Sequence, residues 1–307
     1  MKILVCGANG QVGRDIINRA PAFGLEAIGL DRSQLDITQA DQVEQAVLRY
    51  RPALIINSAA YTNVDGAETD QALADAVNRD GPGNLAAVAQ KYGIALLHIS
   101  TDYVFSGEAK TPYRETDTTG PTGVYGASKL AGEAMIQDRL AKHVILRTSW
   151  VYGIHGNNFV KTMLRVGAQR DELSVVCDQF GCPTKASTIA ETLLELARRY
   201  KRQGDLPWGL YHYSGRSPCS WYDFAVEIFQ QAQAQGLLEN RPTVFAIPTS
   251  EYPTPAQRPL WSVLDCTRFE STFGLPTRDW RDELTGVIGH LAQVERSAQQ
   301  MEQRARA

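Results

Sequence analysis

A tyrosine and a lysine stand four residues apart in the run Tyr125-Gly-Ala-Ser-Lys129. On a helix this spacing puts the phenol and the ammonium group on one face, one turn apart. A free tyrosine has a pKa of about 10, too high for efficient proton transfer at neutral pH, and a neighbouring cation lowers that pKa by stabilising the phenolate. The pair therefore predicts a tyrosine general acid tuned by Lys129. The alternative is an ordinary exposed helical pair.

A hydroxyl group that could act beside this pair belongs to Thr101, in the run Ser100-Thr-Asp-Tyr-Val-Phe105. The run follows an apolar segment that predicts a strand, and a doubly wound sheet binds its ligands at the carboxyl ends of its strands. There the Thr101 hydroxyl could hydrogen-bond to a carbonyl oxygen and polarise it next to the acidic proton of Tyr125. The three side chains together predict acid–base chemistry at a carbonyl group.

A glycine-rich loop, Gly7-Ala-Asn-Gly10-Gln-Val-Gly13, directly follows the first predicted strand and opens a predicted helix. In such a loop Gly7 permits the tight turn, Gly10 lets the backbone approach a pyrophosphate, and Gly13 lets the helix pack closely on the strand. The N–H groups of Gly10, Gln11 and Val12 then point at phosphate oxygens from the positive end of the helix dipole. The loop predicts a dinucleotide site.

An acidic residue, Asp31, follows the second predicted strand, eighteen positions after Gly13. This separation is close to the ~20 residues expected for a carboxylate that binds the adenosine ribose. Asp31 favours NADH because it would repel a 2′-phosphate, whereas Arg32 beside it could bind one. The predicted cofactor is therefore NADPH or NADH. An ordinary turn residue after a strand is the alternative for Asp31.

Short apolar runs alternate with helical patterns through the first half of the chain. Strands buried on both faces are continuous in apolar residues, so this alternation predicts an α/β fold with a doubly wound parallel sheet, the Rossmann arrangement. We expect strands at 3–6, 27–30, 53–57, 94–99 and 144–147. We expect helices at about 11–20, 39–50, 71–92 and 125–138, the third of them bent or broken at Asp80-Gly-Pro-Gly83.

The pattern loosens after about Trp150, where helices are expected near 158–170, 187–200 and 221–235 and a strand at 209–213. We therefore predict an NAD(P)-binding domain over 1–150, to which segments near 185–215 return, and a smaller, mainly substrate-binding α/β region over 151–307. Prolines between Pro242 and Pro259 predict mostly loop there. The polar stretch from Val294 to Ala307 predicts a frayed helical tail.

Composition narrows the class of protein. A formal net charge of −3 over 307 residues gives no reason to expect nucleic acid or an anionic membrane as partner. Five cysteines without a C-x-x-C pair predict reduced thiols and a cytoplasmic location. No apolar run reaches the roughly 18 residues of a membrane span, and the first residues do not resemble a signal peptide. The histidines lack metal-ligand spacing, so we expect no metal.

The glycine spacing and the Tyr-x-x-x-Lys run resemble the extended short-chain dehydrogenase/reductases. This resemblance implies that Lys129 also binds the nicotinamide ribose. It further implies that Asp36 and Ile37 contact the adenine ring. On the nicotinamide side, the implied contacts are Ala59, Ala60 and Tyr61. In the sugar-nucleotide dehydratases of this family an Asp-Glu pair follows the threonine. Here Thr101 is followed by Asp102 and Tyr103, so the second acid is missing and simple ketone reduction is favoured.

Within that family, longer runs resemble the dTDP-4-dehydrorhamnose reductases over nearly the whole chain. They include Asn57-Ser-Ala-Ala-Tyr-Thr-Asn-Val-Asp65, Arg147-Thr-Ser-Trp-Val-Tyr152, Asp178-Gln-Phe-Gly-Cys-Pro-Thr184, Cys219-Ser-Trp-Tyr222 and Pro253-Thr-Pro-Ala-Gln-Arg-Pro259. The resemblance implies reduction of the C4 ketone of dTDP-4-dehydro-β-L-rhamnose to dTDP-β-L-rhamnose with NAD(P)H, the last step of dTDP-rhamnose biosynthesis, and a possible homodimer.

The same resemblance implies the substrate contacts. Thr101 and Asp102 would hydrogen-bond to the dTDP-linked deoxysugar, Trp150 would pack on its ring, and Arg258 would bind the pyrophosphate. A core tryptophan and a surface arginine are the alternatives for the last two. Some members of the group bind magnesium through glutamates at a dimer interface. The run Pro183-Thr-Lys-Ala-Ser-Thr-Ile189 carries no glutamate, which argues against magnesium here.

Two other functions stay open at this point. One is a reductase or epimerase that acts on another nucleotide sugar, because the extended family carries several reactions on one scaffold. The other is a non-catalytic regulatory subunit of the kind that accompanies a methionine adenosyltransferase. The intact set of Thr101, Tyr125 and Lys129 argues against the second, because a chain without catalysis has no need of all three.

Overall fold

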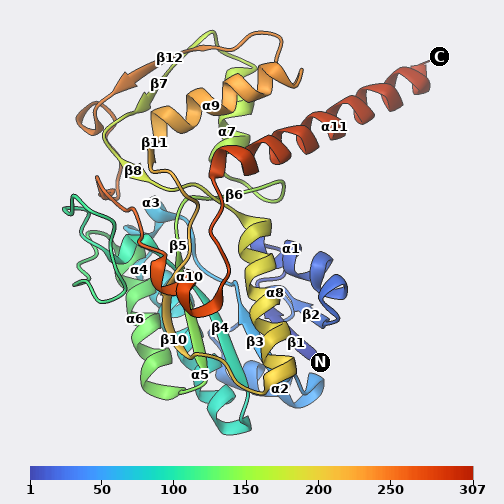
Figure 1. The fold of residues 1–307 in the computed structure, drawn as a ribbon, viewed down its shortest axis with the longest axis vertical. Helices are drawn as coiled ribbons and strands as arrows, with labels where there is room; N and C mark the ends of the chain where they lie inside the picture. The colour runs from blue at the N-terminus through green and yellow to red at the C-terminus, as the bar shows by residue number, and fades with distance from the viewer. Residues whose placement is uncertain (307) are drawn as a thin grey trace.

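The computed structural model describes residues 1–306, and its centre is a six-stranded sheet in the order β10-β5-β4-β3-β1-β2 (Figure 1). All neighbouring strands of this sheet are parallel. The strands are β1 (Lys2–Cys6), β2 (Glu26–Leu30), β3 (Leu54–Asn57), β4 (Ala95–Thr101), β5 (His143–Thr148) and β10 (Gly209–His212). The strand order reverses at β1, between β2 and β3, which is where such sheets bind ligands. The predicted doubly wound α/β fold is confirmed.

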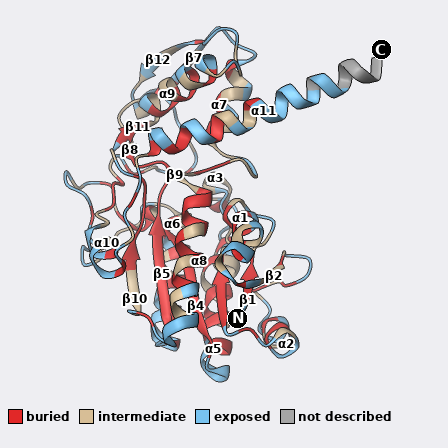
Figure 2. Ribbon diagram, turned by 45° about the vertical axis from the view of Figure 1, so that its right-hand side comes forward, coloured by how far each residue is buried: buried red, intermediate tan, exposed pale blue. Residues whose placement is uncertain are grey.

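Helices cover both faces of the sheet because successive strand residues point to opposite sides. In β1, Ile3 and Val5 belong to one buried cluster, whereas Leu4 and Cys6 belong to the other. Figure 2 shows the buried strands between the two helical layers. The first layer contains α1 (Gln11–Arg19), α8 (Ala186–Gln203) and α10 (Thr267–Phe273), and the second contains α2 (Ala40–Tyr50), α5 (Gly81–Tyr92) and α6 (Val124–Arg139).

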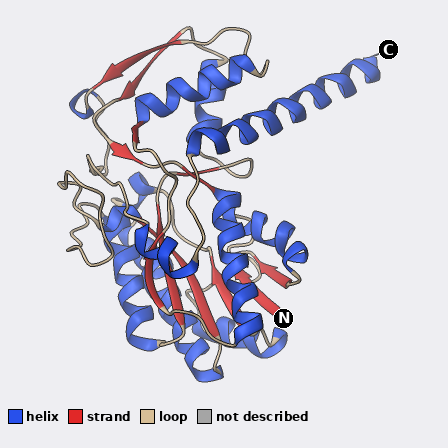
Figure 3. Cartoon of the chain, viewed as in Figure 1, coloured by secondary structure: helices blue, strands red, loops and turns tan. Residues whose placement is uncertain are grey.

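Two elements of the sheet layer come from late in the chain. Strand β10 pairs with β5, with Gly209 opposite Val144, and helix α8 packs beside α1. The intervening and following segments form a smaller α/β layer above the carboxyl edge of the sheet (Figure 3). Its elements are β7 (Glu172–Val176), β12 (Thr243–Ile247), α7 (Phe159–Gly167), α9 (Trp221–Ala234) and the start of α11 (Trp280–Arg306). The predicted smaller C-terminal α/β part is thus confirmed.

Large aromatic side chains fill the core of this smaller layer. Tyr152, Phe224, Phe229 and Trp280 are each at most 1% exposed. The remaining short elements connect the two layers or lie at the edge of the sheet. They are η1 (Ala20–Phe23), α3 (Val64–Ala67), α4 (Gln71–Asp75), η2 (Ala76–Asp80), η3 (Asp102–Val104), η4 (Thr249–Glu251), β6 (Val151–Tyr152), β8 (Phe180–Gly181), β9 (Thr184–Lys185) and β11 (Cys219–Ser220).

Three local predictions can be set against the structure. The region 71–92 is helical throughout, as predicted, but it is not one α-helix, because a π-helical segment, η2, joins α4 to α5. The proline-rich stretch 242–259 is mostly loop, as predicted, but it also contains β12, which pairs with β7 along its whole length. The side chains of β12 are half-exposed or exposed, so this strand lacks the apolar run of a buried one. The tail is helical to Arg306, as predicted, and glutamine, alanine and arginine favour helix there. Helix α11 projects away from the rest of the molecule (Figure 1).

Within residues 1–306, no helix has both the length and the apolar character needed to cross a membrane.

Candidate active site

A cleft of about 600 Å³ lies where the carboxyl ends of β1, β3 and β4 meet the smaller layer. Residues predicted from five separate parts of the sequence line this one space. They are Gly10, Gln11 and Val12 from the glycine loop, Ala60 after β3, Thr101 and Asp102 at the end of β4, Tyr125 on α6, and Trp150 after β5. The fold therefore brings the predicted phosphate loop and the predicted acid–base residues together.

The glycine loop has the shape that a bound pyrophosphate requires. Gly7 has a φ of +77°, and a Cβ there would lie 2.6 Å from the backbone nitrogen of Ala59. A Cβ on Gly13 would lie 2.2 Å from the carbonyl oxygen of Gly7, so α1 can approach β1 only with glycine at this position. Gly10 is the N-cap of α1 and no side chain caps that helix end. The first-turn amides of Gln11 and Val12 therefore remain available to phosphate oxygens.

The predicted adenosine contacts surround the end of β2. The carboxylate of Asp31 accepts hydrogen bonds from Asn9 Nδ2 at 2.7 Å and from Ser33 Oγ at 2.6 Å. The Ser33 hydrogen bonds hold the pKa of Asp31 below its usual value, so this residue is anionic at neutral pH. Asp36 accepts from the backbone of Thr38 at 3.0 Å, and the side chain of Ile37 is buried. None of these three lines the cleft itself.

The segment after β3 is held by two buried asparagines. The backbone N–H of Ala59 donates to Asn57 Oδ1 at 3.1 Å. Asn78, on η2, accepts from the backbone nitrogen of Tyr61 at 2.9 Å and donates to its carbonyl oxygen at 3.0 Å. Between them Ala60 faces the cleft. No role for Asn57 or Asn78 was predicted from the sequence, although Asn57 begins one of the runs that resemble the reductases.

Thr101 and Asp102 form the floor of the cleft. Thr101 Oγ1 donates to Asp102 Oδ1 at 3.0 Å, and Asp102 is 2% exposed. Its other oxygen, Oδ2, has no hydrogen-bond partner within the described part of the chain. Burial raises the pKa of Asp102 to about 7. A buried acceptor without a partner costs free energy, and Asp102 is one of the residues that line the cleft.

Tyr125 lies on the first turn of α6, beside Thr101. The helix comes this close because residue 126 is glycine, whose Cβ would lie 2.1 Å from the carbonyl oxygen of Tyr103. The ring of Tyr103 meets that of Tyr125 edge to face, with centroids 5.8 Å apart. Burial raises the pKa of Tyr125 to about 12, while a hydrogen bond with Thr101 acts in the opposite direction. The phenol is therefore fully protonated at neutral pH, as a proton donor must be.

Lys129 shares the helix face of Tyr125, one turn further along α6, and is buried. Its Nζ donates to the carbonyl oxygen of Ile99 at 2.7 Å, and the residue is 2% exposed. Burial lowers the pKa of Lys129 to about 8, against the charge of Glu133, which raises it. Burial of the phenol raises the pKa of Tyr125, and the lowering effect of Lys129 on that pKa stays a prediction.

Trp150 lies in the cleft wall, with a φ of +46°. Trp221, at the start of α9, stacks on it with ring centroids 3.5 Å apart and planes 6° apart. A Cβ on Gly181 would lie 2.5 Å from the indole, so the tryptophan also needs glycine at that position. Sequence reasoning did not assign a role to Trp221, although it stands in the run Cys219-Ser-Trp-Tyr222 that supported the resemblance.

Arg258 lines a second cavity, of about 430 Å³, rather than the main cleft. The two spaces share Tyr103 and Trp221 as walls. The guanidinium donates to both carboxylate oxygens of Asp65, each at 2.9 Å. The Arg258 hydrogen bond lowers the pKa of Asp65. Asp65 lies in the first turn of α3, and the sequence did not reveal its pairing with a residue 193 positions away.

A buried ion pair supports the floor of the cleft from behind. Arg147, on β5, donates to both oxygens of Glu133, on α6, at 2.9 Å and 2.6 Å. Ser100, directly before Thr101, donates to the same carboxylate at 2.5 Å. Glu133 and Arg147 are 2% and 3% exposed. Arg147 begins one of the runs quoted for the resemblance, but no local pattern in the sequence predicts that it pairs with Glu133.

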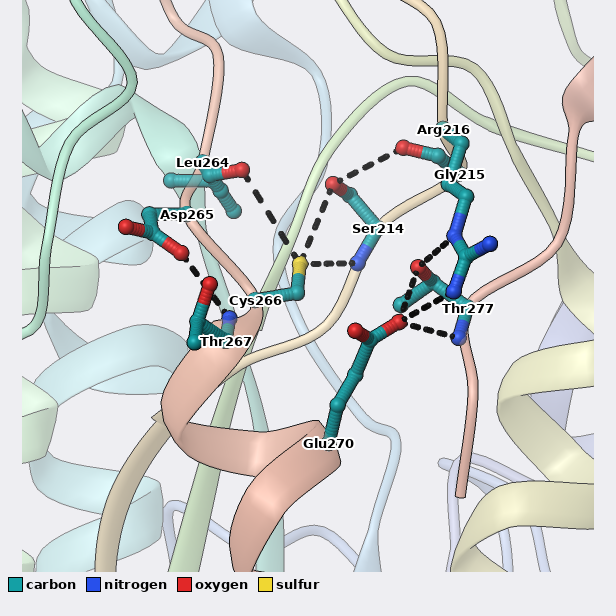
Figure 4. A network of polar contacts seen from close by, with 9 residues as sticks. All are labelled: Ser214, Gly215, Arg216, Leu264, Asp265, Cys266, Thr267, Glu270 and Thr277. Carbon is teal, nitrogen blue, oxygen red and sulfur yellow. Dashed lines mark hydrogen bonds and ion pairs between the residues drawn. The ribbon is translucent and has the colours of Figure 1, made fainter. Parts of the chain in front are cut away.

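A second polar cluster, far from the glycine loop, joins α10 to the segment after β10 (Figure 4). Its thiol, Cys266, accepts from the backbone of Ser214 at 3.3 Å, and burial raises the pKa of Cys266 to about 11. A thiol with so high a pKa is not an activated nucleophile. Across the residues that the structure describes, no three His, Cys, Asp or Glu side chains come together as a metal site.

Comparison with known proteins assigns this arrangement to a family. The model of the family described as RmlD substrate binding domain matches residues 1–293. The chain belongs to this family.

Individual members of the RmlD family match over nearly their full length. The dTDP-4-dehydrorhamnose reductase of Aggregatibacter actinomycetemcomitans is 45% identical over 287 residues, which cover 93% of this chain and 98% of that protein. The crystal structure of a Clostridium acetobutylicum dTDP-4-dehydrorhamnose reductase superposes with a TM-score of 0.88 at 42% identity, covering 95% of this chain and 99% of that one. The Bacillus anthracis enzyme in complex with NADP gives a TM-score of 0.86 at 37% identity, covering 93% and 98%.

Proposed function

We propose that this protein reduces the C4 ketone of dTDP-4-dehydro-β-L-rhamnose to dTDP-β-L-rhamnose, the last step of dTDP-rhamnose biosynthesis, with NADPH or NADH as cofactor. The observation that carries this proposal is the meeting of Thr101 and Tyr125 with the glycine loop in one cleft. Membership in the RmlD family and the names of its full-length relatives supply the substrate.

Bound NAD(P)H supplies the hydride that attacks C4 of the sugar. Tyr125 donates its phenolic proton to the carbonyl oxygen as negative charge develops there. Thr101 hydrogen-bonds to the same oxygen and orients it. Lys129 binds the hydroxyl groups of the nicotinamide ribose. The amides of Gln11 and Val12 at the start of α1 bind the pyrophosphate of the dinucleotide.

The remaining substrate contacts are proposals of the same kind. Asp102 Oδ2, which lacks a partner, forms a hydrogen bond with a sugar hydroxyl, and Trp150 provides an apolar wall for the deoxysugar ring. Arg258, in the neighbouring cavity, binds the pyrophosphate of the nucleotide sugar. Its pairing with Asp65 fixes the direction of the guanidinium before the ligand binds.

The choice between the two cofactors depends on the end of β2. The anionic Asp31 would repel a 2′-phosphate and favours NADH, whereas Arg32, exposed beside it, would attract one and favours NADPH. We propose that both cofactors bind. We also propose that residues 1–150, with segments near 185–215, hold the dinucleotide, that most of 151–307 holds the sugar nucleotide, and that the protein is a cytoplasmic homodimer.

A coupled assay tests the function directly. The substrate dTDP-4-dehydro-β-L-rhamnose is made enzymatically in place and offered with NADPH and with NADH, in parallel with other nucleotide-linked keto-sugars. The expected result is oxidation of the cofactor and formation of dTDP-rhamnose, identified by mass and by the NMR couplings at C4. Preferential reduction of another keto-sugar would identify a different substrate. A product with the mass of its substrate would indicate an epimerase.

A further inference from the structure

Behind Lys129 a chain of polar side chains runs through the sheet without reaching solvent. Asn57, at the end of β3, lies opposite His98 in the neighbouring strand β4. Asn57 Nδ2 is 3.0 Å from His98 Nδ1, and His98 Nε2 is 3.4 Å from Lys129 Nζ. Asn57 and His98 are fully buried, and Lys129 is 2% exposed. The mechanism proposed above gives no role to the first two residues.

The direction of every hydrogen bond in this chain follows from its first member. The backbone N–H of Ala59 can only donate, and it donates to Asn57 Oδ1 at 3.1 Å. The amide nitrogen of Asn57 therefore faces His98, and an amide nitrogen can only donate. Nδ1 of His98 must accept. The orientation of the asparagine is thus determined by a backbone group that cannot turn round.

His98 then presents a donor to Lys129. Burial lowers the pKa of His98 well below its usual value, so the imidazole is neutral and carries its single proton on Nε2. That proton points toward Lys129 Nζ. An ammonium group has no lone pair to accept it, whereas a neutral amine does. The contact is therefore favourable only with the amine form of Lys129, which still donates to the carbonyl oxygen of Ile99.

Other charged and titratable groups around Lys129 do not reverse the preference for its neutral amine form. On α6, Glu133 raises the pKa of Lys129, but its carboxylate is shared with Arg147, and the net effect of burial is a pKa of about 8. On β5, His143 contacts the carbonyl oxygen of Leu140 through Nδ1. Tyr125, on the same helix face, is a neutral phenol at this pH.

We propose that His98 is a positioning residue that donates a hydrogen bond from Nε2 to the neutral amine of Lys129, and that binding of the nicotinamide dinucleotide is coupled to uptake of one proton from water, which converts Lys129 to its ammonium form. The ammonium then donates to the ribose hydroxyls, and the fraction of Lys129 that is a neutral amine in the free protein becomes positively charged. This inference rests on the proposed function only for the class of cofactor.

Calorimetric titration with NADH in buffers of different ionisation enthalpy measures the proton uptake. NADH has no group that titrates between pH 7 and 9, and NADPH serves as a second ligand. For a lysine pKa of about 8 in the free protein and a much higher one in the complex, uptake should rise from about 0.1 proton at pH 7 to about 0.7 at pH 8.5. Binding without pH-dependent uptake would overturn the proposal and leave the cofactor assignment intact.

Two variants of one position separate the hydrogen bond from mere packing. His98→Leu removes the donor, so the pKa of Lys129 should rise and the uptake at pH 8.5 should fall at least twofold. His98→Gln keeps an N–H donor and should behave as the unmodified protein does. If the proton uptake of both variants equals that of the parent protein, the proposal is contradicted. It is also contradicted if the uptake of both variants falls by the same amount.

A measurement without cofactor is independent of the reductase assignment. In protein labelled with ¹³C at lysine Cε, one resonance should titrate near pH 8 and should be missing from the Lys129→Arg variant. If no lysine titrates below pH 9.5, the proposal that Lys129 is a neutral amine in the free protein is wrong, whatever the protein binds. Failure of both NADH and NADPH to bind, with that resonance present, would instead contradict the proposed function.

Discussion

Two polar clusters of this protein, one at the end of β4 and one after β10, differ in how far their hydrogen bonds are completed within the chain. In the cleft, Asp102 is buried with one oxygen unpaired and its pKa is raised. In the cluster of Figure 4, one oxygen of Glu270 accepts from Arg216 at 2.9 Å and from the backbone and hydroxyl of Thr277 at 2.8 Å and 2.7 Å. Burial acts to raise the pKa of Glu270, but the hydrogen bonds from Arg216 and Thr277 lower it below its usual value.

This difference in hydrogen bonding distinguishes a ligand-binding site from a cluster that only stabilises the fold. Hydrogen bonds that are completed within the protein stabilise the fold, whereas groups left incomplete cost stability and are available to a ligand. The cluster of Figure 4 contains a cysteine, a carboxylate and an arginine, which are residue types that also occur in active sites. Because its members satisfy one another, we expect it to act only in stability. Substitution of Tyr125 in the cleft should therefore lower turnover with little effect on stability, and substitution of Glu270 in the cluster of Figure 4 should lower stability with little effect on turnover.

The largest effect is expected for Tyr125→Phe. Loss of the phenolic proton should lower kcat by a factor of about 10² to 10⁴, with little change in cofactor affinity or in the free energy of unfolding. Steady-state rates with the keto-sugar and NADH fluorescence titrations measure the two quantities. The matched control is Glu270→Gln, which should keep its kcat within about twofold. Unimpaired turnover by the phenylalanine variant would remove Tyr125 from the mechanism.

Glu270→Gln should instead weaken the fold. The substitution replaces charge-assisted hydrogen bonds to Arg216 and Thr277, so the free energy of unfolding should fall by about 1 to 3 kcal/mol at pH 7. Urea denaturation followed by circular dichroism measures it. If stability is unchanged while the turnover collapses, the cluster of Figure 4 has a functional role and the contrast drawn above is wrong.

The pH dependence of stability should differ in sign between the clusters. Asp102 has a raised pKa in the folded protein, so its contribution is present at pH 4 and is lost as the pH rises toward 7. Glu270 has a lowered pKa, so its contribution is present above pH 5 and is lost as the pH falls below 4.

Unfolding of Asp102→Asn and Glu270→Gln between pH 4 and 8 makes this comparison. Relative to the parent protein, Asp102→Asn should gain stability with rising pH, on the order of 3 kcal/mol over the range. The deficit of Glu270→Gln should shrink toward pH 4. Parallel curves for the two variants would show that burial of Asp102 does not hold its proton.

The smallest effect is expected for Cys266→Ser. Because burial keeps the pKa of this thiol near 11, turnover should change by less than about twofold, and the parent should resist iodoacetamide at pH 7. Rates and mass spectrometry after alkylation measure the two. Rapid alkylation of Cys266 with loss of activity would mean that the cluster opens in solution.

Much of the fold could be predicted because its signals are local. Continuous apolar runs such as Ile3–Cys6 between helical patterns require a parallel sheet, and the three glycines after the first strand require a tight turn into a helix. The four-residue spacing of Tyr125 and Lys129 places them on one helix face in any structure. Each of these features depends on residues that are close in the sequence.

Only the tertiary structure decided which partners these residues meet. The pairing of Asp65 with Arg258, the stacking of Trp221 on Trp150, and the chain from Asn57 through His98 join segments far apart in the sequence, and no periodicity predicts them. Protonation states belong to this second class as well. A pKa depends on burial and on neighbouring charges, which exist only once the sheet and α6 have closed around Lys129 and Tyr125.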